Sequence, residues 1–128
     1  MNPRAEMIAY LTANSITAVY TPPVSPSVAL PYVCITLISC PADNDNLLET
    51  VFREQNWQID IYGETTAQVD VLASSVETAF NKAGTFPTYG GAAVSSMRIQ
   101  SFADNTELEH EGAEESIIRY TYEIQILK

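Results

Sequence analysis

The chain has 128 residues, of which 46% are hydrophobic, and this suits one compact domain and excludes a chain that is disordered by composition. Its 16 acidic and 6 basic residues give a net charge of −10, which excludes a protein that grips nucleic acid through clustered Lys and Arg. No apolar run approaches the ~20 residues of a membrane helix and the first residues lack the apolar core of a signal peptide, so we expect a soluble protein that stays in the cytoplasm of the cell that makes it.

The N-terminal segment predicts a helix followed by extended chain. The helix covers residues 2–14, where Asn2 can cap it and Pro3 suits its first turn. Its narrow apolar stripe consists of Ala5, Ile8, Ala9 and Leu11. Residues 16–20 then predict a short extended piece. The segment 21–31 contains four prolines, which forbid a helix or a central strand, so we expect an extended loop there.

Two strands follow. The run YVCITLISC, residues 32–40, is β-branched and apolar on both faces, which predicts a central strand. It separates Cys34 from Cys40 by six residues, or about 20 Å, so no bridge between them is expected. A polar loop, 41–50, leads to the second strand, 51–63. In that strand one face is core (Trp57, Ile59 and Ile61), and the opposite face is wet or shared with a partner (Gln58, Asp60 and Tyr62).

A long helix comes directly after the second strand. Thr65 and Gln68 match a capping box, T-x-x-Q, at its start, and Gly84 fits its end. One helical face then carries the apolar residues Val69, Leu72, Ala73, Val76, Ala79 and Phe80. We expect this face to cover the core side of the preceding strand.

The rest of the chain predicts two strands with a long connector. Residues 84–93 contain the turn residues of a loop, including a glycine pair, and 94–102 form a strand. An acidic connector, 103–115, leads to the final strand, 116–128, and the two strands form a hairpin. The expected fold class is therefore α+β, with a mostly antiparallel sheet, a short N-terminal helix and one long helix packed on one face, in a single domain 1–128.

No motif for catalysis or for a bound cofactor is found. The sequence DNDN at 43–46 fails as a calcium loop, because Leu47 and Leu48 stand where a third oxygen ligand and a glycine belong. The single imidazole, His110, is flanked by flexible acids and lacks the partners of a zinc site or of a serine nucleophile. The cysteines lie in a buried strand, where a thiol is inert. We therefore expect no enzyme, no metal and no cofactor, and solvated faces rather than a catalytic pair at the acids Asp60, Glu64 and Glu123.

Tyrosines are the candidate contact residues. Tyr120 and Tyr122 share one face of the final strand, and we expect Tyr62 and Tyr32 near them. Tyrosines are frequent anchors of protein interfaces, although the alternative is that these are core residues under the helix. The candidate subunit or partner interface consists of Tyr20, Val24, Tyr62, Tyr120 and Tyr122.

Four segments carry a resemblance to a known family. They are the helix that runs into the proline segment (AYLTANSITAVYTPPVSP), the strand entry LPYVCITLIS, the strand-to-helix unit WQIDIYGETTAQVDVLASSVETAF and the closing strand RYTYEIQI. Together they span nearly the full length, and their layout resembles the tail terminator, or tail completion, proteins of long-tailed bacteriophages. The likeness lies in the architecture more than in signature residues.

The resemblance implies a structural virion protein without catalytic residues. Such a protein forms a ring, typically hexameric, at the head-proximal end of the tail tube, ends tube polymerisation and offers a docking surface to the head connector. It is assembled in the host cytoplasm and resides in the tail neck. Its implied partners are copies of itself, the tail tube protein and the head connector or stopper protein, and no membrane.

An acidic ring would let DNA pass without specific binding. Six copies would carry six times −10, that is −60, and like charges repel DNA phosphates. The candidate acidic lumen or loop residues are Asp43, Asp45, Asp104, Glu107, Glu109, Glu111, Glu114 and Glu115.

Three other functions are compatible with the same pattern. A head-completion, stopper or other neck protein of the same joint would not cap tail tubes. A small cytoplasmic ligand-binding α+β domain predicts a pocket between helix and sheet and an assembly no larger than a dimer. An enzyme would need carboxylates with perturbed pKa values in a deep pocket.

Overall fold

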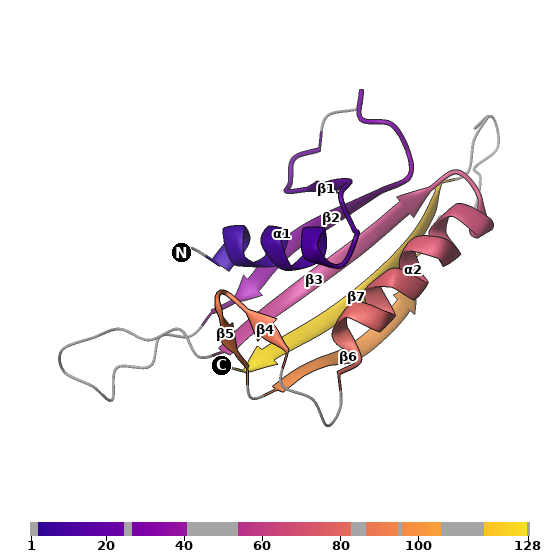
Figure 1. Cartoon of the computed structure of the whole chain (residues 1–128). Helices are drawn as coiled ribbons and strands as arrows, with labels where there is room; N and C mark the ends of the chain where they lie inside the picture. The colour runs from indigo at the N-terminus through magenta and orange to yellow at the C-terminus, as the bar shows by residue number, and fades with distance from the viewer. Residues whose placement is uncertain are drawn as a thin grey trace.

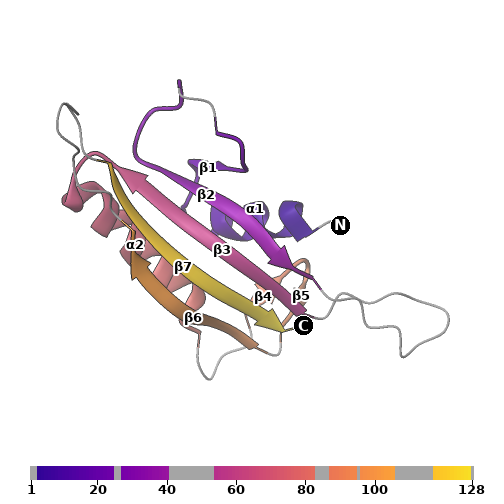
Figure 2. The same ribbon diagram turned by 180° about the vertical axis from the view of Figure 1, so that it is seen from behind.

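The computed structural model describes residues 3–24, 27–40, 54–82, 87–94, 96–105 and 117–127. These residues form two layers, because both helices lie on one face of a five-stranded sheet (Figure 1). In the described part of the chain, no other element covers the opposite face (Figure 2). The expected α+β class is confirmed. The elements are α1 (Pro3–Ala13), β1 (Val19–Tyr20), β2 (Tyr32–Ser39), β3 (Glu54–Gly63), α2 (Thr66–Phe80), β4 (Thr88–Tyr89), β5 (Ala92–Ala93), β6 (Ser96–Asp104) and β7 (Ile118–Leu127).

The strands of the large sheet lie in the order β1-β2-β3-β7-β6. Every neighbouring pair is antiparallel except β1 with β2. β3 and β7 pair along their whole length, from Glu54 opposite Leu127 to Gly63 opposite Ile118. The predicted hairpin of the last two strands, β6 and β7, is confirmed. The two edges are unequal, since β1 has 2 residues and β6 has 9.

α1 ends in a left-handed turn at Ser15, whose φ is 66°. The Ser15 N–H donates to the carbonyl of Thr12 (3.0 Å). The Ile16 N–H donates to the carbonyl of Leu11 (2.9 Å), and the two bonds together make a Schellman motif. Leu11 and Ile16, which this motif brings together, are both fully buried. The motif therefore fixes the angle at which the chain leaves the helix towards β1.

The face that α1 packs against the rest of the protein differs from the predicted stripe. Ile8, a member of that stripe, is exposed, and the buried residues of α1 are Glu6, Met7, Tyr10 and Leu11. The prediction was wrong because Tyr10 reaches an aromatic cluster, with ring centroids 5.4 Å from Phe80 and 5.6 Å from Tyr89. Burying these large rings outweighs burying the smaller stripe of Ala5, Ile8 and Ala9.

α2 begins as the sequence predicts. The Gln68 N–H donates to Thr65 Oγ1 (3.2 Å), and Gln68 Oε1 accepts from the N–H of Glu64 (3.0 Å). The helix packs closely on the end of β3, because a Cβ at Gly63 would lie 2.6 Å from Val69 Cγ2. Leu72 is half-buried, and the buried residues of this face are Val69, Ala73, Val76, Ala79 and Phe80.

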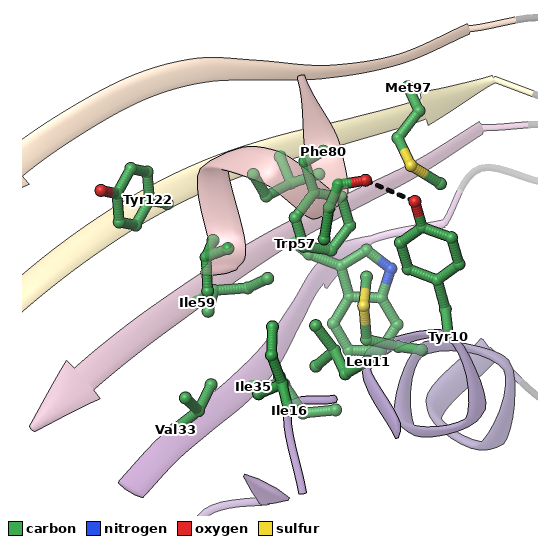
Figure 3. Close-up of a cluster of buried hydrophobic side chains, with 14 of the residues drawn as sticks. Tyr10, Leu11, Ile16, Val33, Ile35, Trp57, Ile59, Phe80, Met97 and Tyr122 are labelled. Atoms are coloured by element: carbon green, nitrogen blue, oxygen red, sulfur yellow. Dashed lines mark hydrogen bonds between the residues drawn. The ribbon is translucent and has the colours of Figure 1, made fainter. Parts of the chain in front are cut away.

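The core lies between the two helices and the sheet (Figure 3). Trp57, Ile59 and Ile61 of β3 are fully buried there, which confirms the predicted core face. The Tyr10 hydroxyl crosses the core and donates to the carbonyl of Ala79 in α2 (Figure 3). This bond ties the N-terminal helix to the C-terminal end of the second helix.

A small hairpin, β4 with β5, was not predicted. It lies in the segment that the sequence assigns to a loop, and it turns at Gly90 and Gly91, whose φ values are 65° and 84°. Tyr89 of this hairpin is buried, and its hydroxyl donates to Gln55 Oε1 (2.7 Å), which also accepts from Trp57 Nε1 (2.9 Å). The hairpin therefore closes one end of the core.

Several predictions lie outside the described residues. These are the calcium-like sequence at 43–46, His110, and the acids Asp43, Asp45, Glu107, Glu109, Glu111, Glu114 and Glu115. The predicted helix end at Gly84 is wrong, because α2 ends at Phe80 and Asn81 is its C-cap. Cys34 and Cys40 are described and form no disulfide with each other. Cys34 is buried, as expected, whereas Cys40 follows the end of β2 and is only half-buried.

Candidate assembly interface

The uncovered face of the sheet is the first candidate interface. Side chains alternate along each strand, so the residues beside the core positions of β3 point to the uncovered face, as the sequence predicts. Figure 2 views the sheet from this side, where β2, β3, β7 and β6 lie open to the viewer. A single chain therefore presents a broad sheet face that its own helices do not protect.

A row of aromatic rings crosses one end of this face. We call Tyr20, Tyr32, Tyr62 and Arg119 the tyrosine row. Tyr32 stacks on Tyr62 with ring centroids 5.1 Å apart, and Tyr20 meets Tyr32 edge-on at 5.8 Å. The Arg119 guanidinium lies 5.7 Å from the centre of the Tyr62 ring. Because Tyr32, Tyr62 and Arg119 are opposite one another in the register of β2, β3 and β7, the row follows from strand pairing.

A buried carboxylate fixes the arginine of the row, so the expectation that Asp60 lies on a solvated face is wrong. Asp60, which is 4% exposed, accepts from Arg119 Nε (3.2 Å) and from Thr121 Oγ1 (2.6 Å) through its Oδ1. Its Oδ2 accepts from Gln58 Nε2 (2.9 Å). The Arg119 charge is therefore paired with the buried Asp60 carboxylate, and its guanidinium lies over the Tyr62 ring.

The hydroxyl and thiol groups around the row stay protonated at neutral pH. Burial, and then the Asp60 charge, raises the pKa of both Tyr62 and Cys34. Burial and the neighbouring Cys34 raise the pKa of Tyr32. The row is thus a neutral aromatic surface that carries one paired cation, which is the kind of surface that anchors protein contacts.

The structure separates the candidate tyrosines onto two faces. Tyr62 and Tyr32 lie on the uncovered face, whereas Tyr120 and Tyr122 lie on the helix side, so the expected proximity of the four is wrong. The reason is the register, which places Tyr120 opposite the core residue Ile61. Tyr122 is 2% exposed and belongs to the core, as the alternative interpretation has it.

The outer edge of β6 is the second candidate interface, and the sequence did not reveal it. Among the described residues, no strand pairs with this edge. Phe102, 51% exposed, lies there with ring centroids 5.3 Å from Tyr120 and 5.0 Å from Tyr122. The tyrosine hydroxyls in turn donate to α2, Tyr120 to Asp70 Oδ1 (3.3 Å) and Tyr122 to Glu77 Oε1 (2.7 Å).

We call Phe102, Tyr120, Asp70, Glu77 and Asp104 the Phe102 flank. Asp104, the described member of the candidate lumen acids, is exposed at the end of β6 and stands opposite Tyr120 in the register. The charges of Asp70 and Asp104 both raise the pKa of Tyr120, after its desolvation by burial. The flank therefore combines an exposed aromatic ring and one carboxylate on the edge strand with two carboxylates on the neighbouring helix α2.

Two further predictions concern Val24 of the candidate interface and the pocket that a ligand-binding domain would need. Val24 is half-buried in the proline segment, next to the exposed Pro22 and Pro23. A hollow of about 180 Å³ lies between α1 and the β4–β5 hairpin, where Glu6, Tyr10 and Tyr89 line it. The ligand-binding alternative predicts a pocket between the long helix and the main sheet. This hollow instead lies between α1 and the small hairpin.

Two further observations concern metals and membranes. In the ranges that the structure describes, no three His, Cys, Asp or Glu side chains gather as metal ligands would. Over the same ranges, neither helix has the length and apolar character needed to cross a bilayer.

Comparison with known proteins adds no identification. No family model matches the chain, and no curated protein matches its sequence.

Proposed function

We propose that this chain is a structural subunit that closes into a ring with its own copies, and that the ring is the tail terminator of a long-tailed bacteriophage. In this role it caps the head-proximal end of the tail tube, ends tube polymerisation and receives the head connector. With six copies, as is typical of the family it resembles, the ring carries −60 in total. The protein acts through its surfaces and transforms no substrate.

The observation that supports this proposal most is the uncovered sheet face with its tyrosine row. Tyr and Arg are the residues that most often anchor interfaces, and here they form one continuous row across β1, β2, β3 and β7. A closed ring needs two different surfaces on each copy, one for each neighbour. The tyrosine row supplies one of these surfaces.

Charge supports the passage of DNA. Eight of the 16 acidic residues belong to the segments 41–53 and 106–116, at which the described strands break off. β2 precedes the segment 41–53, and the register places the end of β2 beside the C-terminal end of β7. β6 precedes the segment 106–116, and the register places the end of β6 near the C-terminal end of β3. Acids that face a lumen would repel the phosphates of DNA.

The decisive experiment combines the protein with purified tail-tube subunits. Electron microscopy should show a ring at one end of each tube and tubes of limited length. Virions assembled without the protein should give overlong tails beside full heads that lack tails. Normal virions would end the proposal, and uncapped tubes of unlimited length would favour the head-completion or stopper alternative.

Self-association has its own test. Tyr62→Ala removes the centre of the tyrosine row and should weaken the ring at least about tenfold, because interface tyrosines dominate binding energy. Analytical ultracentrifugation with and without tubes measures the assembly, and thermal unfolding checks that the variant folds. The matched control is Phe102→Ala, an exposed aromatic ring at the other candidate interface, which should leave the ring intact. Equal losses in both variants would contradict the assignment of the ring contact to the tyrosine row.

A further inference from the structure

We propose that the outer edge of β6 binds an extended, basic strand of a protein other than a second copy of this chain. The incoming strand continues the sheet, and its Lys or Arg side chains face the carboxylates of the Phe102 flank. This inference names a partner chemistry beyond the ring, and it holds whether or not the ring forms.

The edge geometry provides the first argument. A strand at the edge of a sheet presents a row of unpaired N–H and C=O groups, and an added strand satisfies them. β6 offers 9 residues for such pairing, which is longer than an average strand. Its exposed residues include Phe102, whose ring is fixed edge-on against Tyr120 and so forms a rigid apolar contact for one side chain of the added strand.

Charge complementarity decides the chemistry of the occupant. Asp70, Glu77 and Asp104 are exposed on the side of the edge that α2 borders. The described basic residue of β6, Arg98, is engaged on the opposite face, where its Nε donates to Gln125 Oε1 (3.0 Å). An approaching strand with cations at alternate positions would therefore meet three carboxylates, whereas an acidic strand would be repelled.

A second copy is a poor occupant of this edge. On one edge of the copy, β1 is 2 residues long and is followed by Pro22 and Pro23, which have no N–H to donate to a ladder. The part of β2 that lies beyond its pairing with β1, residues 35–39, contains no cation. Its β6 would bring Met97, Phe102 and Asp104 to the helix side, and none of these is a cation. The copy as a whole also carries −10. The partner is therefore a different and basic chain.

The test uses the full chain and synthetic peptides of the same length as β6. In the first peptide lysine alternates with valine, in the second glutamate replaces lysine, and in the third proline replaces the central valine. Fluorescence anisotropy at low salt should show binding of the lysine peptide and at least about tenfold weaker binding of the other two. Amide chemical shifts should move along β6, residues 96–104, and raised salt should weaken binding.

Variants of the protein distinguish binding at the β6 edge from non-specific attraction between the basic peptide and the acidic protein. Phe102→Ala and Asp70→Lys should each weaken the lysine peptide about tenfold. The matched control is Glu123→Lys, which makes the same charge change on the uncovered face and should alter binding less than about twofold. Tyr62→Ala, which tests the ring, should leave peptide binding unchanged.

Four results would overturn the inference. They are no binding of the lysine peptide, equal binding of the proline peptide, an equal loss in Glu123→Lys, and shifts confined to another face. A fifth is a dimer that forms through β6 and that Phe102→Ala dissolves, since the occupant would then be a second copy.

Discussion

Three buried tyrosines should make the protein lose stability at alkaline pH. Burial is the largest cause that raises the pKa of Tyr10, Tyr89 and Tyr122, and the hydrogen-bonded Glu77 carboxylate raises that of Tyr122 further. In the unfolded chain these groups ionise near a pKa of about 10. Above that pH the unfolded state binds fewer protons than the folded state, so the free energy of unfolding falls as the pH rises.

The size of the effect follows from the linkage relation. At pH 11, a tyrosine that ionises only in the unfolded chain lowers the free energy of unfolding by about 1.4 kcal/mol. Three such groups lower it by up to about 4 kcal/mol, a large part of the ~5–15 kcal/mol typical of a domain. At pH 9 the three together contribute only about 0.2 kcal/mol. The contribution is thus almost fully present at pH 9, and its loss begins near pH 10 and continues at higher pH until the tyrosines ionise in the folded protein as well.

Urea unfolding at pH 9 and at pH 11 measures this loss. Tyr122→Phe keeps the ring and removes the titrating hydroxyl, so the variant should lose about 1.4 kcal/mol less than the parent between the two pH values. At both pH values the variant also lacks the bond to Glu77, worth about 1 kcal/mol, which largely cancels in the comparison. Ionisation of the lysines is common to both proteins. An identical loss in parent and variant would refute the reasoning.

Three more substitutions test the local structure by urea unfolding. Gly63→Ala should destabilise the protein by about 1–3 kcal/mol, because the added Cβ would lie 2.6 Å from Val69 Cγ2, and an unchanged midpoint would contradict this close packing. Ser15→Gly should stabilise it by about 0.5–1 kcal/mol, since glycine adopts the left-handed conformation at no steric cost, whereas Ser15→Ala should not. Gln55→Leu should cost about 2 kcal/mol, because two buried donors lose their acceptor while one unpartnered amide nitrogen is removed, and a neutral effect would show that the bonds matter little.

The elements with a single dominant pattern were predictable from the sequence. The alternation around Trp57 and the capping pair Thr65 and Gln68 each encode one local structure, and the structure confirms both. The face of α1 could not be derived in the same way, because apolar residues occur on more than one side of that helix. Its orientation is decided by Phe80 and Tyr89, which come from distant parts of the chain.

The unpredicted hairpin and the candidate interfaces differ in how they could have been found. Two short runs joined by Gly90 and Gly91 match the two-residue hairpin signal, and that signal was available in the sequence. The tyrosine row depends on which strands become neighbours, and periodicity within one strand carries no such information. Likewise, nothing in the segment around Phe102 indicates that β6 ends the sheet, because an edge is defined by the strand that is missing beside it.

The unequal lengths of the two edge strands affect how far a sheet could grow by adding copies of this molecule. A monomer with two reactive ends propagates a chain, whereas a monomer with one reactive end is a chain stopper. β6 offers a long pairing edge, and β1 offers 2 residues before the prolines begin. Any sheet that this molecule joins through β6 thereby acquires a shorter outer margin, made of the 2 residues of β1 and of the part of β2 that lies beyond its pairing with β1.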